Sequence, residues 1–179
     1  PMKSKISFDQ LRKLNIGAGF LHVGSLIAII LLSNDFSFSV NAEYLGGPPG
    51  SDSYETIRVF DYTVAYVIAL FFGLSSFFHF LVSATGFREK YEAGLKKHIN
   101  VFRWVEYSLS STVMIFLIAQ LNGLTNYATL LAIAGVNVSM ILFGWLQERY
   151  IKPGSGDLLP FWFGSIAGII PWVIIAIQL

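Results

Sequence analysis

The 179-residue sequence contains no cysteine, which excludes disulfide bonds and thiolate chemistry within the chain. Charged residues are scarce: they make up 13% of the chain, against roughly 25% in an average soluble protein. The cations form no basic patch with interleaved aromatic residues, so nucleic acid is not an expected partner. Hydrophobic residues instead make up 54% of the sequence. This composition is typical of a protein whose partner is membrane lipid.

Five long apolar segments predict an all-α integral membrane protein. Each is about 18 residues or longer, enough for a helix to cross a hydrocarbon core of ~30 Å. We interpret residues 1–179 as a single transmembrane helical domain. The predicted helices cover residues 8–32, 59–85, 96–121, 127–146 and 158–179. A charged loop, FREKYEAGLKKH, is expected to lead to the third of them.

A polar loop, residues 34–58, separates the first two predicted helices. Within it, FSFSV alternates apolar and polar residues, and GGPPG is a strong turn signal. This pattern predicts a β-hairpin lying over the membrane surface.

The positions of the cations predict the orientation of the chain in the membrane. Ten of the twelve lysine and arginine residues lie at the amino terminus, in residues 86–97, or in residues 149–152. Positive charges concentrate in cytoplasmic segments of membrane proteins. The sequence therefore predicts a multi-pass protein of the cell membrane with a cytoplasmic amino terminus and an extracellular hairpin loop.

The third predicted helix carries an unusual number of polar residues in its first half. It reads NVFRWVEYSLSSTVMIFLIAQ (100–120), and a carboxylate such as Glu106 costs roughly 2.5–3.5 kcal/mol or more inside a bilayer. His22, His79 and Glu106 each lie nine residues from a cation at the cytoplasmic end of their helix. At 1.5 Å per residue this places all three about 13 Å deep. We expect them to form one polar layer.

Other side chains are expected near this layer. On the third helix, several polar residues recur at three- and four-residue spacing and share one face, and Ser75 lies one turn from His79 on the second helix. The residues expected to share the polar interior are Asn100, Arg103, Tyr107, Ser110, Asn137, Met140 and Trp162. Several polar residues of the layer and its surroundings also have a structural explanation. A single intramembrane histidine is often a packing hydrogen-bond donor, serines commonly join helices, and Arg103 can snorkel to the surface. The shared depth of three ionisable groups favours a functional centre.

Several long motifs resemble heliorhodopsins. They are YLGGPPG (44–50), GLSSFFHF (73–80), FRWVEYSLSSTVMIFLIAQ (102–120), SMILFGWLQERY (139–150) and DLLPFWFGSIAGIIPW (157–172). The resemblance extends from the first predicted helix to the end of the chain. It implies a seven-transmembrane-helix rhodopsin bundle, of which about five helices are present here, usually dimeric, with all-trans retinal bound as a protonated Schiff base.

The resemblance also implies roles for individual residues. Glu106 matches the family's Schiff-base counterion. The polar cavity and proton network would comprise His22, His79, Ser75, Asn100, Tyr107 and Ser110. The retinal pocket would be lined by Ser111, Met114, Asn137, Met140 and Trp162. Arg103 and Glu148 match a polar cluster on the cytoplasmic side.

One feature departs from the family. The lysine that binds retinal lies on the seventh helix, whereas the lysines of this sequence all lie at or beyond the ends of the predicted helices, at positions 3, 5, 13, 90, 96, 97 and 152. The sequence also stops within an apolar run. We therefore expect it to be truncated at its C-terminal side.

The sequence thus predicts a light-absorbing retinal protein with a photosensory or regulatory role, an unidentified signalling partner, and neither catalytic residues nor a metal site. Ion pumping is not expected, because residues 107–121 contain no aspartate or glutamate to relay protons. Two alternatives remain open at this stage. One is a light-independent proton or ion carrier that uses Glu106, His22 and His79, and the other is a membrane adaptor that acts through its extracellular loop.

Overall fold

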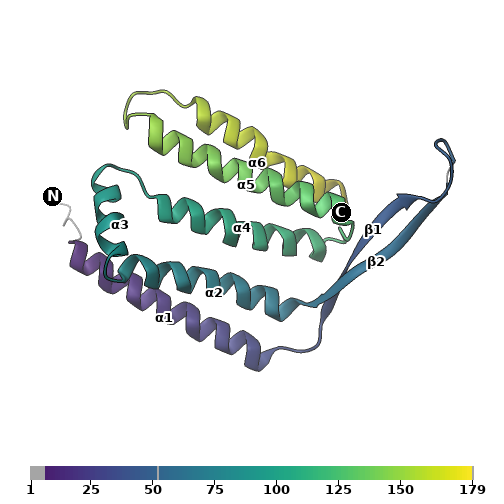
Figure 1. Cartoon of the computed structure of the whole chain (residues 1–179), viewed down its shortest axis with the longest axis horizontal. Helices are drawn as coiled ribbons and strands as arrows, with labels where there is room; N and C mark the ends of the chain where they lie inside the picture. Colours follow the sequence, from purple (N-terminus) through teal and green to yellow (C-terminus); the bar gives the residue numbers. More distant parts are fainter. Residues whose placement is uncertain (1–6, 52, 179) are drawn as a thin grey trace.

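The computed structural model describes residues 7–51 and 53–178. Six helices and one antiparallel hairpin follow each other along the chain (Figure 1). Their bounds are α1 Phe8–Leu32, β1 Ser37–Leu45, β2 Tyr54–Thr63, α2 Val64–Ser83, α3 Phe87–Lys96, α4 Val101–Leu121, α5 Tyr127–Tyr150 and α6 Leu159–Gln178. Within the described residues, all helices except α3 are long and apolar enough to span a membrane. The predicted fold class, five membrane helices with a hairpin, is confirmed.

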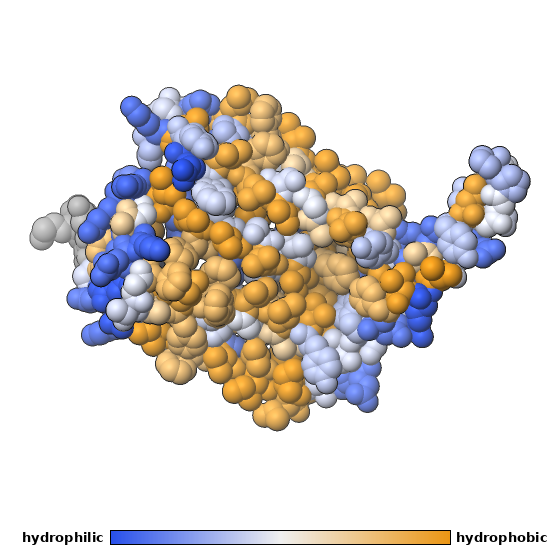
Figure 2. All heavy atoms as spheres, in the orientation of Figure 1, coloured by the Kyte–Doolittle hydropathy of each residue, from blue (hydrophilic) through white to orange (hydrophobic). Residues whose placement is uncertain are grey.

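The membrane helices form a row in which each packs against its neighbour in sequence (Figure 1). Helix α1 lies against α2, α2 against α4, α4 against α5, and α5 against α6. Helix α3 and the α5–α6 connection lie at one end of this row, here called the α3 end. The β-hairpin lies at the other, the hairpin end. Hydrophilic residues gather at both ends, and the surface between them is largely apolar (Figure 2).

The second membrane helix begins later than the sequence predicts. Residues 59–63 were expected to be helical, but they continue strand β2, and α2 starts at Val64. The apolar residues here pair across the hairpin, Phe60 with Val40 and Tyr62 with Phe38. A bulge between Val40 and Asn41 interrupts the register. A short apolar run fits both a strand and a helix, so its periodicity did not distinguish them.

The half of the hairpin nearest the helices is part of the protein core. Val40 is fully buried and belongs to a cluster that includes Ile115 and Ile133. The backbone N–H of Asn41 donates to the carbonyl of Thr125 in the α4–α5 turn at 2.9 Å. The far half projects away from the bundle (Figures 1 and 2). The near half therefore packs against the helix ends, at the side where the sequence predicted a hairpin over the membrane surface.

Helix α3 corrects a second prediction. The segment FREKYEAGLKKH was expected to be a charged loop, but residues 87–96 are helical. Most of these residues are good helix formers, and Arg88 pairs with Glu92 one turn later at 2.5 Å. Gly86, at φ +90°, separates this helix from α2. Membrane helix α4 consequently begins at Val101 rather than near residue 96.

Tyr62 links the hairpin to helix α4. Its hydroxyl donates to Oε1 of Gln120 at 2.9 Å, and Gln120 is almost fully buried. Burial raises the pKa of the Tyr62 phenol from 10.0 to about 12. The phenol therefore keeps its proton in the folded protein at pH values where an unfolded tyrosine has lost it.

This difference predicts a pH dependence of stability. Between about pH 10 and 12 the unfolded chain binds fewer protons at Tyr62 than the folded chain, so the free energy of unfolding falls as pH rises. In Tyr62→Phe this contribution should be absent, and the stability advantage of wild type over the variant should shrink across that window. Thermal unfolding midpoints at several pH values measure it. Tyr54→Phe, at the exposed end of the hairpin, is the control. A wild-type advantage that stays constant with pH would contradict the role of Tyr62.

Candidate functional site

Glu106 lies in a polar cavity between helices α2 and α4. The Oγ of Ser75, on α2, donates to Oε1 of Glu106 at 3.0 Å. The cavity has a volume of about 220 Å³, and its polar lining residues are Asn15, Ser75, His79, Tyr91, Asn100, Arg103, Glu106 and Tyr107. The structure therefore brings together several residues that the sequence placed in one polar layer. A carboxylate at membrane depth is costly unless a cation pairs with it.

The two histidines lie beside each other at the junction of α1 and α2. Their rings are stacked, with centroids 5.4 Å apart and planes at 13°. His79 Nδ1 lies 2.9 Å from Oδ1 of Asn15 and donates to it when that nitrogen carries the proton. His22 Nδ1 is buried and has no hydrogen-bond partner in the described part of the chain. The pair thus lies next to the Glu106 cavity, which His79 also lines.

Asn15 is a member of this network that sequence reasoning missed. It precedes Gly19 by four residues and His22 by seven, so all three lie on the same face of α1. This spacing could have identified Asn15 from the sequence as a neighbour of His22.

Close contact between α1 and α2 depends on Gly19. Ser76 Oγ donates to the Gly19 carbonyl at 3.1 Å. A Cβ at Gly19 would lie 2.8 Å from the Phe80 ring. Glycine at residue 19 therefore allows α1 and α2, the helices that carry His22 and His79, to pack closely.

A second polar cluster, here called the Glu148 cluster, lies at the α3 end. Glu148 Oε1 accepts from Arg103 Nη2 at 2.9 Å, and Oε2 accepts from the backbone N–H of Asn100 at 2.9 Å. The Trp104 indole N–H also donates to Oε2. The Arg103 guanidinium lies over the Trp104 ring, 4.6 Å from its centroid. The structure pairs Arg103 with Glu148, and adds Trp104, which the sequence analysis did not select.

The residues predicted to line a retinal pocket fall into separate groups. Asn137 is buried on α5 and donates to Ser111 Oγ and Thr112 Oγ1 on α4, both at 2.9 Å. Met140 lies between α5 and α6, where a Cβ at Gly168 would be 2.3 Å from its sulfur. Met114 is half-buried on α4. These four predicted residues, Ser111, Met114, Asn137 and Met140, lie on α4 and α5, beyond Glu106 toward the hairpin end.

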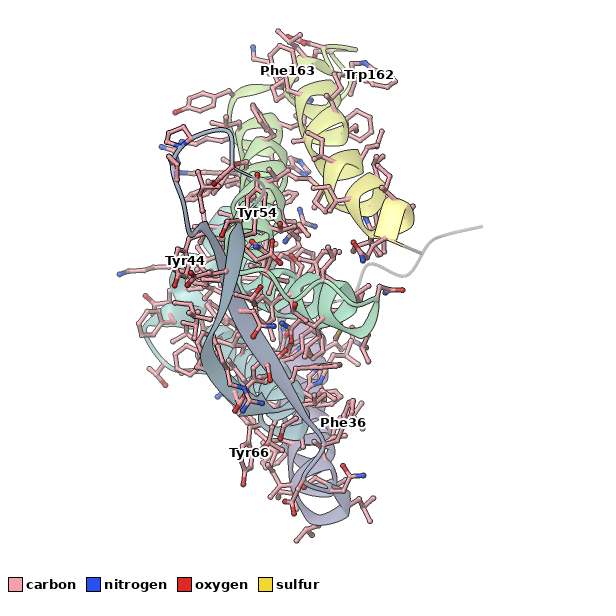
Figure 3. The ribbon with its side chains drawn as sticks, turned by 90° about the vertical axis from the view of Figure 1, so that its right-hand side faces the viewer. Phe36, Tyr44, Tyr54, Tyr66, Trp162 and Phe163 are labelled. Carbon is pink, nitrogen blue, oxygen red and sulfur yellow. The ribbon has the colours of Figure 1, made fainter. Side chains whose placement is uncertain are left out.

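Two residues expected in the polar interior, Trp162 and Ser110, do not line the Glu106 cavity, whereas Tyr107 does. Trp162 is 58% exposed near the start of α6, and Figure 3 shows it at the edge of the molecule rather than beside the polar cavity. Its expected place in the interior with Glu106 is therefore not supported by the described residues. Ser110 is buried but does not line the Glu106 cavity. Tyr107 lines that cavity and is 46% exposed.

Comparison with known proteins identifies the family. The heliorhodopsin family model matches residues 11–179, which is nearly the whole sequence. A search of curated proteins gave no match. The match covers every membrane helix and both polar clusters described above, in agreement with the resemblance carried by the sequence motifs. The chain belongs to the heliorhodopsin family.

Proposed function

We propose that this protein is a light sensor in which Glu106 is the anion paired with the positive charge of bound all-trans retinal. Membership of the family makes the protein a retinal photoreceptor and a multi-pass membrane protein. The counterion, the retinal isomer and a signalling role without ion pumping are the parts that we propose.

The observation that carries the proposal is the Ser75–Glu106 hydrogen bond inside the polar cavity. A hydroxyl that donates to a carboxylate stabilises its ionised form, and it also fixes the direction in which the charge points. An ionised carboxylate at membrane depth needs a cation close by, since the hydrocarbon interior screens charge poorly. The positive charge of retinal meets that need.

The chemistry of the residues fits retinal on the counterion side. When bound, retinal supplies light absorption and a protonated imine. Glu106 would hold that proton in place, with Ser75 positioning the carboxylate. The lysine that forms the imine is not among the residues that line the cavity. Within the described residues, the lysines are at positions 13, 90, 96, 97 and 152, at or near helix ends.

The stacked histidines are suited to receive a proton rather than to transport one across the membrane. Two imidazolium rings 5.4 Å apart would repel each other, so the pair favours at most one added proton. Toward the hairpin end, residues 107–121 offer no carboxylate, and the buried cluster around Val40 and Ile115 is apolar. A proton that reaches the histidines therefore has no carboxylate relay on α4 toward the hairpin end.

We further propose that the amino terminus faces the cytoplasm and that the protein is a homodimer acting on an unidentified signalling partner. Asymmetric placement of cations supports the orientation: α3 and the connections beside it carry the basic residues, whereas the hairpin end carries few. The family resemblance supports the dimer.

Pigment formation tests the proposal. Full-length gene product reconstituted with retinal should show a visible absorption band, and hydroxylamine under illumination should bleach it. Lipid vesicles containing the protein should show no sustained light-driven pH change. Folded protein without a visible band would contradict the sensor and favour a light-independent ion carrier that uses Glu106 and the histidines. Sustained pH change would contradict the absence of pumping.

A further inference from the structure

A second pocket, of about 460 Å³, lies at the α3 end and is separate in position from the Glu106 cavity. It is bounded by the start of α4, the last turns of α5 and the α5–α6 connection, residues 151–158. Figure 1 shows that connection at the same end of the molecule as α3, and hydrophilic residues gather there in Figure 2. The heliorhodopsin match assigns no role to this pocket.

Three nitrogen-bearing side chains, Arg103, Lys152 and His98, line the pocket. The Arg103 side chain is 40% exposed and donates to Glu148 through Nη2, whereas its Nε is buried. Lys152 and His98 are exposed, and within residues 7–51 and 53–178 neither forms an ion pair with a carboxylate. These three side chains come from α4, the α3–α4 connection and the α5–α6 connection, and they line the same pocket.

The acidic residues of the pocket are already engaged. Both oxygens of Glu148 accept from Arg103, Asn100 and Trp104, as described above. Asp157 Oδ1 accepts from the backbone N–H of Leu159 at 3.1 Å, at the first turn of α6. Glu148 thus has three donors and Asp157 has one, and within the described residues neither carboxylate forms an ion pair with Lys152.

The α5–α6 connection allows a close approach by an anion. Gly154 and Gly156 have φ values of +82° and +80°, which favour glycine, and nothing lies within 4 Å of a Cβ built at either residue. Gln147 holds the connection to α5, since its amide donates to the Asp157 carbonyl and accepts from the Phe161 N–H. The wall also includes Trp104 and Phe161, which offer apolar surface.

We propose that this pocket binds a phosphate group that carries an organic body. A guanidinium and an ammonium are the side chains that most often bind phosphate, the first through its fork of N–H donors and the second as a point charge. The volume exceeds what inorganic phosphate needs and falls within the roughly 300–1,000 Å³ of small-molecule sites. The phosphate can come from a soluble compound or from a phospholipid headgroup at the membrane surface. Arg103, one helical turn before Glu106, lines both this pocket and the Glu106 cavity.

Calorimetric titration of the full-length protein in phosphatidylcholine nanodiscs tests this site directly. The probes are inorganic phosphate and phenyl phosphate, and we expect saturable binding with phenyl phosphate the tighter of the two. Lys152→Gln, an exposed position, should weaken binding about tenfold or more, the change expected for loss of one hydrogen bond to a charged group. Arg103→Lys, which keeps the charge and loses the fork, should also weaken it.

Lys90→Gln is the matched control, since Lys90 is an exposed cation on α3 that does not line the pocket. Binding that is absent for both probes, or that weakens equally in Lys90→Gln and Lys152→Gln, would overturn the proposal. Repeating the titration with phosphatidylglycerol in the nanodiscs distinguishes a phospholipid headgroup from a soluble compound as the source of the phosphate. Loss of phenyl phosphate binding there identifies a lipid headgroup as the occupant, and unchanged binding identifies a soluble compound. None of these readouts depends on retinal, so the result is independent of the proposed light sensor.

Discussion

Glu106→Gln should shift the visible absorption band to longer wavelength. The carboxylate stabilises the positive charge of the chromophore in the dark, and a neutral amide of similar shape removes that stabilisation. The pH at which the visible band is lost in alkali should also fall, by about 1–3 units, because a nearby opposite charge typically favours the charged form by that amount. Absorbance titrations of wild type and variant in the full-length protein measure both changes.

Glu148→Gln is the matched control for this substitution. It also neutralises one carboxylate, but Glu148 belongs to the cluster at the α3 end, where Arg103 and Trp104 already satisfy it. Its effect on colour should be much smaller than that of Glu106→Gln. Equal colour shifts in the two variants, or an unchanged band and alkaline midpoint in Glu106→Gln, would mean that Glu106 is not the counterion.

Gly144→Ala should destabilise the protein by about 1–3 kcal/mol, the usual cost of overpacking. A Cβ at residue 144 would lie 2.5 and 2.6 Å from two atoms of the Trp104 ring. That ring cannot move freely, because its indole N–H donates to Glu148 and the Arg103 guanidinium lies over its face. The new methyl group therefore has to displace the Glu148 cluster. Equilibrium unfolding in mixed detergent micelles measures the change.

Gly135→Ala provides the comparison on the same helix. Nothing lies within 4 Å of a Cβ built at Gly135, so Gly135→Ala should introduce no steric clash. Its higher helix propensity should raise the free energy of unfolding by up to about 1 kcal/mol. The contacted atoms belong to the six-membered part of the indole, so Trp104→Phe in the Gly144→Ala background should recover part of the loss. If Gly144→Ala were as stable as Gly135→Ala, the close α4–α5 contact in the structure would be wrong.

The sequence predicted the membrane helices well because their signal is strong and local. Runs of about 20 apolar residues have few alternative structures, and the family match and the structure confirm the fold class. The errors fell where the signal is ambiguous. The apolar residues Val59, Phe60 and Tyr62 fit both a strand and a helix, and the pairing of residues 60–63 with residues 37–40 makes this segment a strand. Residues 87–96 looked like a loop because they are charged, although their composition favours a helix.

The polar layer was partly predictable because depth along a helix follows from residue count. Counting from the terminal cations placed His22, His79 and Glu106 at one level, and the structure stacks the histidines and ties Glu106 to Ser75. Rotation about each helix axis is harder to read from sequence, since it depends on which neighbours pack on each face. Trp162 is an example: it is 58% exposed, and its place in a retinal pocket stays a prediction. The contact between Trp104 on α4 and Glu148 on α5 depends on the small size of Gly144 on α5. No local sequence pattern predicts such a contact between two helices.

The ionisation state of Glu106 in the dark is the most direct test of the central claim. Infrared spectra of the full-length pigment, recorded for wild type and Glu106→Gln with carbon-13-labelled glutamate, isolate the contribution of this one carboxyl group. If Glu106 is the counterion, the difference contains a carboxylate band and no band of a protonated carboxyl group. A protonated carboxyl band that is present in the wild type and absent from the variant would contradict it, since a neutral Glu106 cannot balance the charge of the chromophore.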